Sequence, residues 1–437
     1  MTQVIVATHK HDCTNLLGKY LDESHYDTLI EDDVDFYKVG ALDGDNSELS
    51  ESECIFKFRK NVFSAREQLW AYEGLVSAAQ PTQNRGMAAG PKQGKLGNRD
   101  WVTEVQWDIL DCVINDQINI FGDDPITEIE LRHKRNPVES TRGMVWLRSK
   151  IADEGFTYED FFNHKVEVWK SMPSDEASAD ALHVKTKYIS DTTYANAVNS
   201  GIAGFFDRYP RIPYGRATSY TEKNPDLYKK CFPFMMTLAE QFSQLMPTRH
   251  AAQETYADKI DPRFRVAGKN TPFTTITVNK NFRTAAHRDA GDLTEGFSNL
   301  TVVSKEKEWE GGYLVLPEYR IAINVRPGDV LLINNHEGIH GNTEIIPPAG
   351  KTVEDMERIS LVCYFRENMI DLGSWEYEQQ RYNFVTSRRL ASSDPKFNGV
   401  TAKMWQSEEW YDYLRTNGGE DLLDEYHPQT STLEAFF

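Results

Sequence analysis

Two histidines and an aspartate have the residue types and the spacing of a metal site. His287 and Asp289 are separated by one residue and follow a strand-like run, so both side chains can reach one ion from the end of a single strand. His340 follows a later strand-like run, DVLLIN. Two imidazoles and one carboxylate on one face of a metal suit ferrous iron and leave neighbouring coordination positions open. The pattern predicts an Fe(II) site formed by His287, Asp289 and His340.

The spacing of a His-x-Asp pair is weak support when it stands alone. His25 and Asp27 form a second copy of the pair, but they have no strand context and no matching downstream partner. His336 competes with His340 for the third ligand position. It falls in the turn-like sequence NNHEG, whereas His340 enters the next extended run, and we therefore favour His340.

An arginine after the third ligand can bind a carboxylate. Arg358 begins the strand-like run RISLVCYF, and Ser360 faces the same side of that run. A guanidinium binds a carboxylate through two parallel hydrogen bonds, which suits the far carboxylate of 2-oxoglutarate. We therefore predict Fe(II) and 2-oxoglutarate as cofactors, with O2 as co-substrate. The alternative for Arg358 is a surface ion pair with the acids of EDMER, in which case Arg366 replaces it.

The elements that must position these residues lie in a β-rich region. Short β-branched and aromatic runs between 273 and 365 are separated by Gly, Pro, Asn and Asp, as in an antiparallel sandwich or barrel. Apolar residues three and four apart predict helices in WVTEVQWDILDCVIND, YEDFFNHKVEVWKSM and YKKCFPFMMTLAEQFSQLM. The predicted organisation is an N-terminal section (1–98) with acidic and Gly/Pro-rich loops, then a dioxygenase domain (99–437) with helical support (101–260), a β-core (265–370) and a C-terminal helical tail.

Composition and charge restrict the setting and the partners. The chain has 437 residues, and no apolar run approaches the roughly 20 residues that span a bilayer. Five scattered cysteines and the absence of a secretory signal predict an intracellular protein, in the cytoplasm or nucleus, or in the host cytoplasm if the chain is viral. The net charge of -19 repels nucleic acid at long range. The basic clusters 85–99, 131–150 and 208–216 are either a local DNA groove or solvated surface.

The sequence resembles the TET/JBP family of nucleic-acid base oxygenases, particularly its J-binding-protein-like and viral members. The resemblance covers about 200–370 and rests on FTTITVNKNFRTAAHRDAGDL, GGYLVLPEYRIAINVRPGDVLL, HGNTE and RISLVCYF, with weaker echoes in GFFDRYPRIPYGRATSYT and RGMAAGP. It implies an α+β fold in which helices flank a double-stranded β-helix (jelly-roll or cupin-like) core. It also implies the same iron and 2-oxoglutarate groups, with Arg283 assisting the co-substrate.

The resemblance further implies hydroxylation of the 5-methyl group of a pyrimidine in DNA, either 5-methylcytosine or thymine. In a duplex such a base must be flipped out of the stack. Candidate stacking residues are Phe273, Phe282 and Tyr313, each of which is otherwise a core aromatic. Candidate readers of the base edge are Asn279, Asp292 and His336.

Two other functions remain open on the sequence. The acidic net charge favours a 2-oxoglutarate-dependent hydroxylase of a small molecule or amino acid. The second alternative is a module that binds a modified base without oxidising it. The cysteine-rich zinc region of animal TET enzymes is absent from this sequence, and no extra DNA-binding module is obvious. No membrane association and no protein partner are predicted.

Overall fold

The computed structural model describes residues 2–41, 49–82, 85–91, 197–207, 215–289, 291–305, 309–390 and 407–417. The chain divides into two compact units. The first consists of Met1–Pro91, Tyr194–Tyr382 and Asp424–Phe437, and the second consists of Lys92–Thr193 and Asn383–Leu423. The helices predicted in 101–116 and 158–172 lie outside the described residues, and so do 92–99, 131–150 and 208–214 of the three basic clusters.

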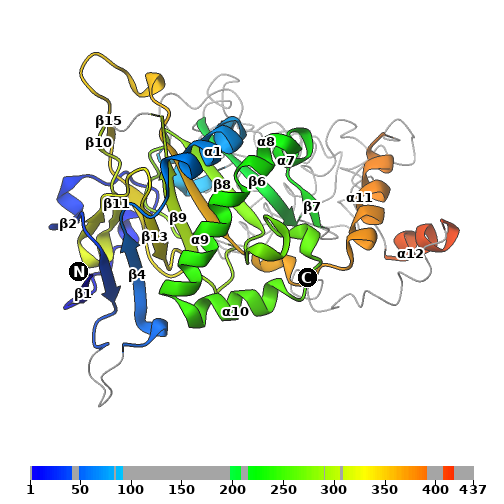
Figure 1. The fold of residues 1–437 in the computed structure, drawn as a ribbon, viewed down its shortest axis with the longest axis horizontal. Coiled ribbons are helices and arrows are strands. Elements are labelled where there is room, and N and C mark those ends of the chain that lie inside the picture. Colours follow the sequence, from blue (N-terminus) through cyan, green and yellow to red (C-terminus); the bar gives the residue numbers. More distant parts are fainter. Residues whose placement is uncertain are drawn as a thin grey trace, which may run out of the picture. The chain divides into compact units, whose positions relative to one another are not determined.

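The first unit is a mixed structure of helices around a large, mainly antiparallel sheet (Figure 1). Within the described residues this sheet has ten strands, in the order β1-β3-β4-β13-β9-β16-β8-β6-β5, with β7 paired to β6. Their bounds are β1 (Gln3–Val6), β3 (Val34–Tyr37), β4 (Cys54–Arg59), β13 (Val330–Ile333), β9 (Ser298–Val303), β16 (Ile359–Tyr364), β8 (Thr275–Lys280), β6 (Val198–Asp207), β5 (Gln80–Thr82) and β7 (Gly215–Ala217).

A smaller sheet packs on part of the large one. Its order is β14-β11-β12-β2, and a separate two-stranded ribbon joins β10 to β15. Leucine, isoleucine, valine and phenylalanine side chains from both larger sheets form one shared core. The bounds are β14 (Gly341–Asn342), β11 (Leu314–Leu316), β12 (Ile321–Ile323), β2 (Thr28–Ile30), β10 (Glu310–Gly311) and β15 (Ile345–Ile346).

Helices cover the opposite face of the large sheet. Buried residues of α1, α8 and α9 share a second core with residues of β8, β13 and β16. A capping box in which Ser64 and Glu67 bond reciprocally starts α1. The described helices of the first unit include α1 (Ala65–Leu75), α7 (Ser219–Lys223), α8 (Pro225–Lys230), α9 (Phe232–Leu245) and α10 (Pro247–Ala257). Helix α11 (Trp375–Leu390) begins in the first unit and ends in the second, and α12 (Ser407–Thr416) belongs to the second. In the second unit, Phe384 of α11 packs on Tyr413 of α12, with ring centroids 4.9 Å apart.

The alternation of side chains along β16 divides the two faces. Ile359, Leu361 and Cys363 are fully buried in the core under the helices. Because successive side chains of a strand point to opposite faces, Ser360 and Tyr364 turn to the other side, where they line a cavity. The same strand therefore builds the core with one set of residues and the site with the other.

The structure differs from the sequence prediction in one place. The strands β6 and β7 lie within 101–260, which was predicted as helical. Gly201 and Gly204 interrupt the apolar pattern of β6, and its strand conformation depends on pairing with β8 and β5. The N-terminal strands β1, β3 and β4 extend the same sheet as the core strands. The boundary at residue 98 stays a prediction.

No helix in the described ranges is long and apolar enough to cross a membrane. The described cysteines, Cys13, Cys54, Cys231 and Cys363, are all free and buried.

Candidate metal and co-substrate site

The two histidines of the predicted triad are paired directly through their backbones. The amide of His287 donates to the carbonyl of His340, and the amide of His340 donates back, each over 2.9 Å. This reciprocal pair is an isolated antiparallel bridge, which places the two side chains next to each other on one face. The ring centroids are 4.3 Å apart. Residues far apart in the sequence thus meet through two hydrogen bonds that local patterns do not encode.

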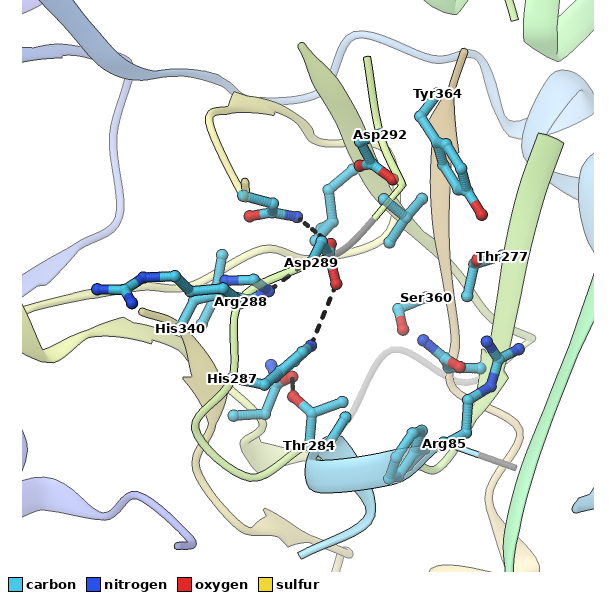
Figure 2. Close-up of a pocket in the computed structure, with 18 of the residues that line it drawn as sticks. Arg85, Thr277, Thr284, His287, Arg288, Asp289, Asp292, His340, Ser360 and Tyr364 are labelled. Carbon is cyan, nitrogen blue, oxygen red and sulfur yellow. Dashed lines mark hydrogen bonds and ion pairs between the residues drawn. The ribbon is translucent and has the colours of Figure 1, made fainter. Parts of the chain in front are cut away.

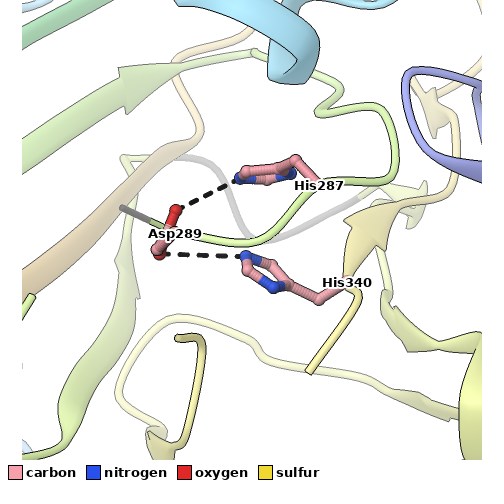
Figure 3. A group of neighbouring side chains, drawn as sticks. All are labelled: His287, Asp289 and His340. Carbon is pink, nitrogen blue, oxygen red and sulfur yellow. Dashed lines mark ion pairs between the residues drawn. The ribbon is translucent and has the colours of Figure 1, made fainter. Parts of the chain in front are cut away.

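Asp289 completes a compact group of three ligand atoms. Its Oδ1 lies 3.3 Å from Nε2 of His287, and its Oδ2 lies 3.8 Å from Nε2 of His340. One ligand atom from each of the three residues lies within 4.8 Å of the other two. Figure 3 shows the three side chains pointing toward one another. The group has the donor set and the compactness of a metal site.

Hydrogen bonds to the backbone fix the orientation of both imidazoles. Nδ1 of His287 donates to the carbonyl of Ala285 over 2.8 Å, and Nδ1 of His340 donates to the carbonyl of Gly338 over 3.1 Å. With a metal bound, each ring would keep its proton on Nδ1 and present the lone pair of Nε2 to the ion. A partner on the second ring nitrogen is the usual support of a metal-bound histidine.

Charges in the group suit a bound cation. Burial raises the pKa of Asp289, but its hydrogen bond with His287 and the charges of His340 and His287 outweigh this effect and lower it to about 2. Burial and the charge of His287 lower the pKa of His340 to about 4. Burial lowers the pKa of His287, but its hydrogen bond and ion pair with Asp289 raise it above its ordinary value. At neutral pH the carboxylate is ionised and His340 is neutral, which are the forms that bind metals.

Asn335 holds the aspartate in place. The side-chain amide of Asn335 donates to Oδ2 of Asp289 over 3.1 Å, and the backbone carbonyl of Asn335 accepts a hydrogen bond from the backbone amide of Asp289 over 3.1 Å. Asn335 is almost fully buried. The sequence signal for this residue was weak, because NNHEG reads only as a turn.

A buried carboxylate ties the two ligand segments together. Oε2 of Glu318 accepts the amide of Ile339, next to His340, over 2.8 Å. Its Oε1 lies 3.8 Å from Nη2 of Arg288, which stands between His287 and Asp289. Glu318 therefore acts on both ligand segments without belonging to the ligand group.

We expect Glu318→Ala to weaken metal binding about tenfold, the effect usual for a residue that supports metal ligands. The substitution leaves the Ile339 amide without its acceptor and removes the negative charge near Arg288. Anaerobic Fe(II) titration measures the dissociation constant. The matched control is Glu73→Ala on α1, which removes an exposed carboxylate that pairs with Lys230 of α8. Equal metal affinity in both variants would contradict a positioning role for Glu318.

The triad faces a cavity of about 470 Å³ between the sheets. Figure 2 shows Arg85, Thr277, Ser360 and Tyr364 across the cavity from the metal-ligand group. Leucine and valine side chains line other parts of the wall. The apolar lining residues include Leu300, Leu314, Val325 and Val362.

Arg358 lies in the lining of the cavity, and none of the described residues gives it an acidic partner. Its side chain is only a few per cent exposed, and Nη2 donates to the carbonyl of Gly312 over 3.2 Å. Its Nε is buried without a hydrogen-bond acceptor. Burial and the charge of Arg326 lower the pKa of Arg358 to about 10, so it remains a cation at neutral pH. A buried cation with a free donor fits a ligand carboxylate.

The other predicted residues divide into two groups. The cavity lining includes Ser360, Asn279, Asp292 and Phe282, and also Arg366, whose side chain pairs with buried Asp207. Four further predicted residues are absent from that lining. Arg283 stacks on Tyr20 and donates to the Leu21 carbonyl, Phe273 packs in the core, and His336 and Tyr313 lie outside the lining.

Arg85 is the main residue that the sequence reasoning missed. It lines the cavity, its Nη2 donates to the carbonyl of Gly201 over 3.0 Å, and its Nε is buried without an acceptor. The signals for it were the weak echo RGMAAGP and its place at the start of the basic cluster 85–99. The second His-x-Asp copy has a different fate, because His25 bonds to Asp22 while Asp27 pairs with exposed Arg320.

Comparison with known proteins identifies the central part of the chain. Residues 201–367 match the Tet_JBP family model, described as the oxygenase domain of the 2OGFeDO superfamily. The chain is 36% identical over 225 residues to thymine dioxygenase JBP1-B of Trypanosoma cruzi (strain CL Brener), covering 50% of this chain and 25% of that protein. It is 34% identical over 204 residues to the bifunctional helicase and thymine dioxygenase JBP2 of Leishmania braziliensis, covering 46% and 18%.

One solved structure that resembles the chain is NgTET1 in complex with 5mC DNA, at 19% identity and a TM-score of 0.32, over 45% of this chain and 70% of that one. The chain spans at most about a quarter of the length of the JBP1-B and JBP2 relatives. The superfamily implies Fe(II) and 2-oxoglutarate. Residues 201–367 are therefore similar to the oxygenase domain of the Tet_JBP family.

Proposed function

We propose that this chain is an Fe(II)- and 2-oxoglutarate-dependent dioxygenase that hydroxylates the 5-methyl group of thymine in DNA, with 5-methylcytosine as the alternative base. The observation that carries the proposal is the meeting of three metal-ligand side chains and a buried, unpaired arginine at one cavity. The names of the relatives, which are thymine dioxygenases, favour thymine.

In this proposal each side chain has a separate task. His287, Asp289 and His340 hold iron, and Arg358 binds the far carboxylate of 2-oxoglutarate, helped by the Ser360 hydroxyl. With iron bound, O2 would be the oxidant: one oxygen atom would go to 2-oxoglutarate, giving succinate and carbon dioxide, and the other would convert a methyl C–H into C–OH. Leu300, Leu314, Val325 and Val362 keep water from that part of the cavity. Arg85 offers a free N–H donor to a carbonyl or carboxylate oxygen of a bound molecule.

The size of the cavity supports a flipped base. A cavity of about 470 Å³ is within the range of small-molecule pockets and takes a small dicarboxylate beside one base, but no duplex. DNA must therefore present the base outside its stack, at a cost of a few kcal/mol. Asn279, Asp292 and Phe282 line the cavity and are the proposed contacts of that base. The facing sheets support a double-stranded β-helix core for this domain.

Mass spectrometry of nucleosides tests the proposed reaction. Duplexes with unmodified thymine and duplexes with 5-methylcytosine are incubated with enzyme, Fe(II), 2-oxoglutarate and O2, and then digested. We expect one oxygen to be added to thymidine, and omission of 2-oxoglutarate to abolish the product. If oxygen is added only to 5-methyldeoxycytidine, the assigned base changes from thymine to 5-methylcytosine. Normal 2-oxoglutarate binding with neither base oxidised would contradict DNA as the substrate.

A small-molecule substrate is the second candidate, because the net charge of -19 opposes DNA binding. Salt separates the two candidates. Activity on DNA should fall steeply as salt rises, since binding to phosphates releases counterions. A salt-independent rate would favour the small-molecule reading. A non-catalytic base-binding module predicts no Fe(II)-dependent binding of 2-oxoglutarate.

A further inference from the structure

Behind the proposed co-substrate arginine lies a second arginine that the proposed function does not use. The guanidinium carbons of Arg326 and Arg358 lie 4.9 and 6.0 Å from the centroid of one indole ring, that of Trp309. Arg326 also lies over the ring of Tyr313, at 5.7 Å. Trp309 is thus a common neighbour of both guanidiniums, and Tyr313 is a second aromatic neighbour of Arg326.

Three buried N–H donors at this place have no acceptor. They are Nε of Arg358, Nη1 of Arg326 and Nε1 of Trp309. Leaving one such donor unpaired costs about 1–3 kcal/mol, more for a charged group, so three together indicate that an acceptor is missing.

The charges at this place are not balanced by the described residues. Burial and the nearby Arg326 both act to lower the pKa of Arg358, and no carboxylate opposes them. Burial lowers the pKa of Arg326 more than its hydrogen bond with Tyr313 and the charges of Tyr313, Asp329 and Glu31 raise it. The two guanidiniums repel each other, and a bound anion would offset that repulsion. The pair is therefore suited to an anionic ligand rather than to an empty core.

We propose that Arg326 is a positioning residue for the dicarboxylate co-substrate, acting through Arg358. Arg358 lines the cavity, whereas Arg326 is not part of the lining. The second cation strengthens the attraction for the far carboxylate and, with Trp309, limits the positions that Arg358 can adopt. The inference rests on the proposed function, because it assumes that 2-oxoglutarate is the ligand of Arg358.

The test measures the binding of 2-oxoglutarate to the Fe(II) protein without oxygen. The metal-to-ligand charge-transfer absorption band reports the binding. We expect Arg326→Gln to raise the dissociation constant roughly three- to tenfold, the effect of one unit charge at partly buried range. The increase should shrink as salt screens the charge. Arg326→Lys should restore part of the affinity, since the cation is retained. In turnover, KM for 2-oxoglutarate should rise while kcat stays nearly constant.

Controls separate this role from a merely structural one. Arg320→Gln removes the same charge from an exposed ion pair with Asp27 and should leave binding unchanged. A 2-oxo acid without the far carboxylate should bind Arg326→Gln and the unsubstituted protein equally. Unchanged 2-oxoglutarate affinity in Arg326→Gln, or equal losses for both acids, would overturn the inference. If the unsubstituted protein binds no 2-oxoglutarate, the proposed function itself fails.

Discussion

Asp289→Asn should lose both iron binding and product formation while the protein stays folded. The asparagine keeps the size of the side chain and an oxygen that can accept from Asn335, so the hydrogen bond that now spans 3.1 Å is retained. It loses the negative charge that balances a divalent cation between the two imidazoles. Fe(II) then meets two neutral nitrogens and an amide, which is a poor set of ligands for it.

Metal content and nucleoside analysis check this prediction together. Each protein is incubated with Fe(II) without oxygen, desalted and analysed for iron, and a second sample is assayed on DNA. The matched control is Asp27→Asn in the other His-x-Asp copy, whose carboxylate pairs with Arg320 on the surface. The control should retain full iron and full activity. A full iron content in Asp289→Asn would show that the ion is held elsewhere.

Much of the sheet could be predicted because its strands carry their own pattern. The runs around β8, β9, β13 and β16 alternate or concentrate β-branched residues between turn residues, and each forms a strand in the structure. β6 has no such pattern. A Cβ on Gly201 would lie 1.9 Å from the carbonyl oxygen of Ala78. A glycine is therefore needed where these two segments of the backbone approach each other closely. That requirement arises only from tertiary contact.

The site shows the same division between local pattern and long-range contact. The three proposed iron ligands were found because each stands beside a recognisable strand. The residues that support them were not found, since Glu318 and Asn335 reach the ligands from other segments. Arg85 was missed for the same reason, because its presence in the cavity depends on the folding of 85–91 over β8 and β16. The grouping of the three proposed ligands was therefore easier to predict than the contacts that support them.

Arg358→Gln should have the largest effect on the use of 2-oxoglutarate. Removing one partner of a buried, hydrogen-bonded charge pair costs roughly 2–5 kcal/mol, which corresponds to at least about a thirtyfold loss of affinity. Glutamine is shorter, neutral and unable to offer two parallel donors to the far carboxylate. Ser360→Ala removes one neutral hydroxyl, so its loss should be only several-fold. Both values follow from the KM for 2-oxoglutarate and from anaerobic binding.

A change of co-substrate shows whether Arg358 acts on the far carboxylate. The unsubstituted protein should bind 2-oxoglutarate far more tightly than a 2-oxo acid of equal length that ends in a methyl group. Arg358→Gln should lose this preference, because both acids still offer the same keto-acid group to iron. Ser360→Ala should keep most of it. If Arg358→Gln still prefers the dicarboxylate, another cation of the cavity, with Arg85 or Arg366 the first to test, must bind that group.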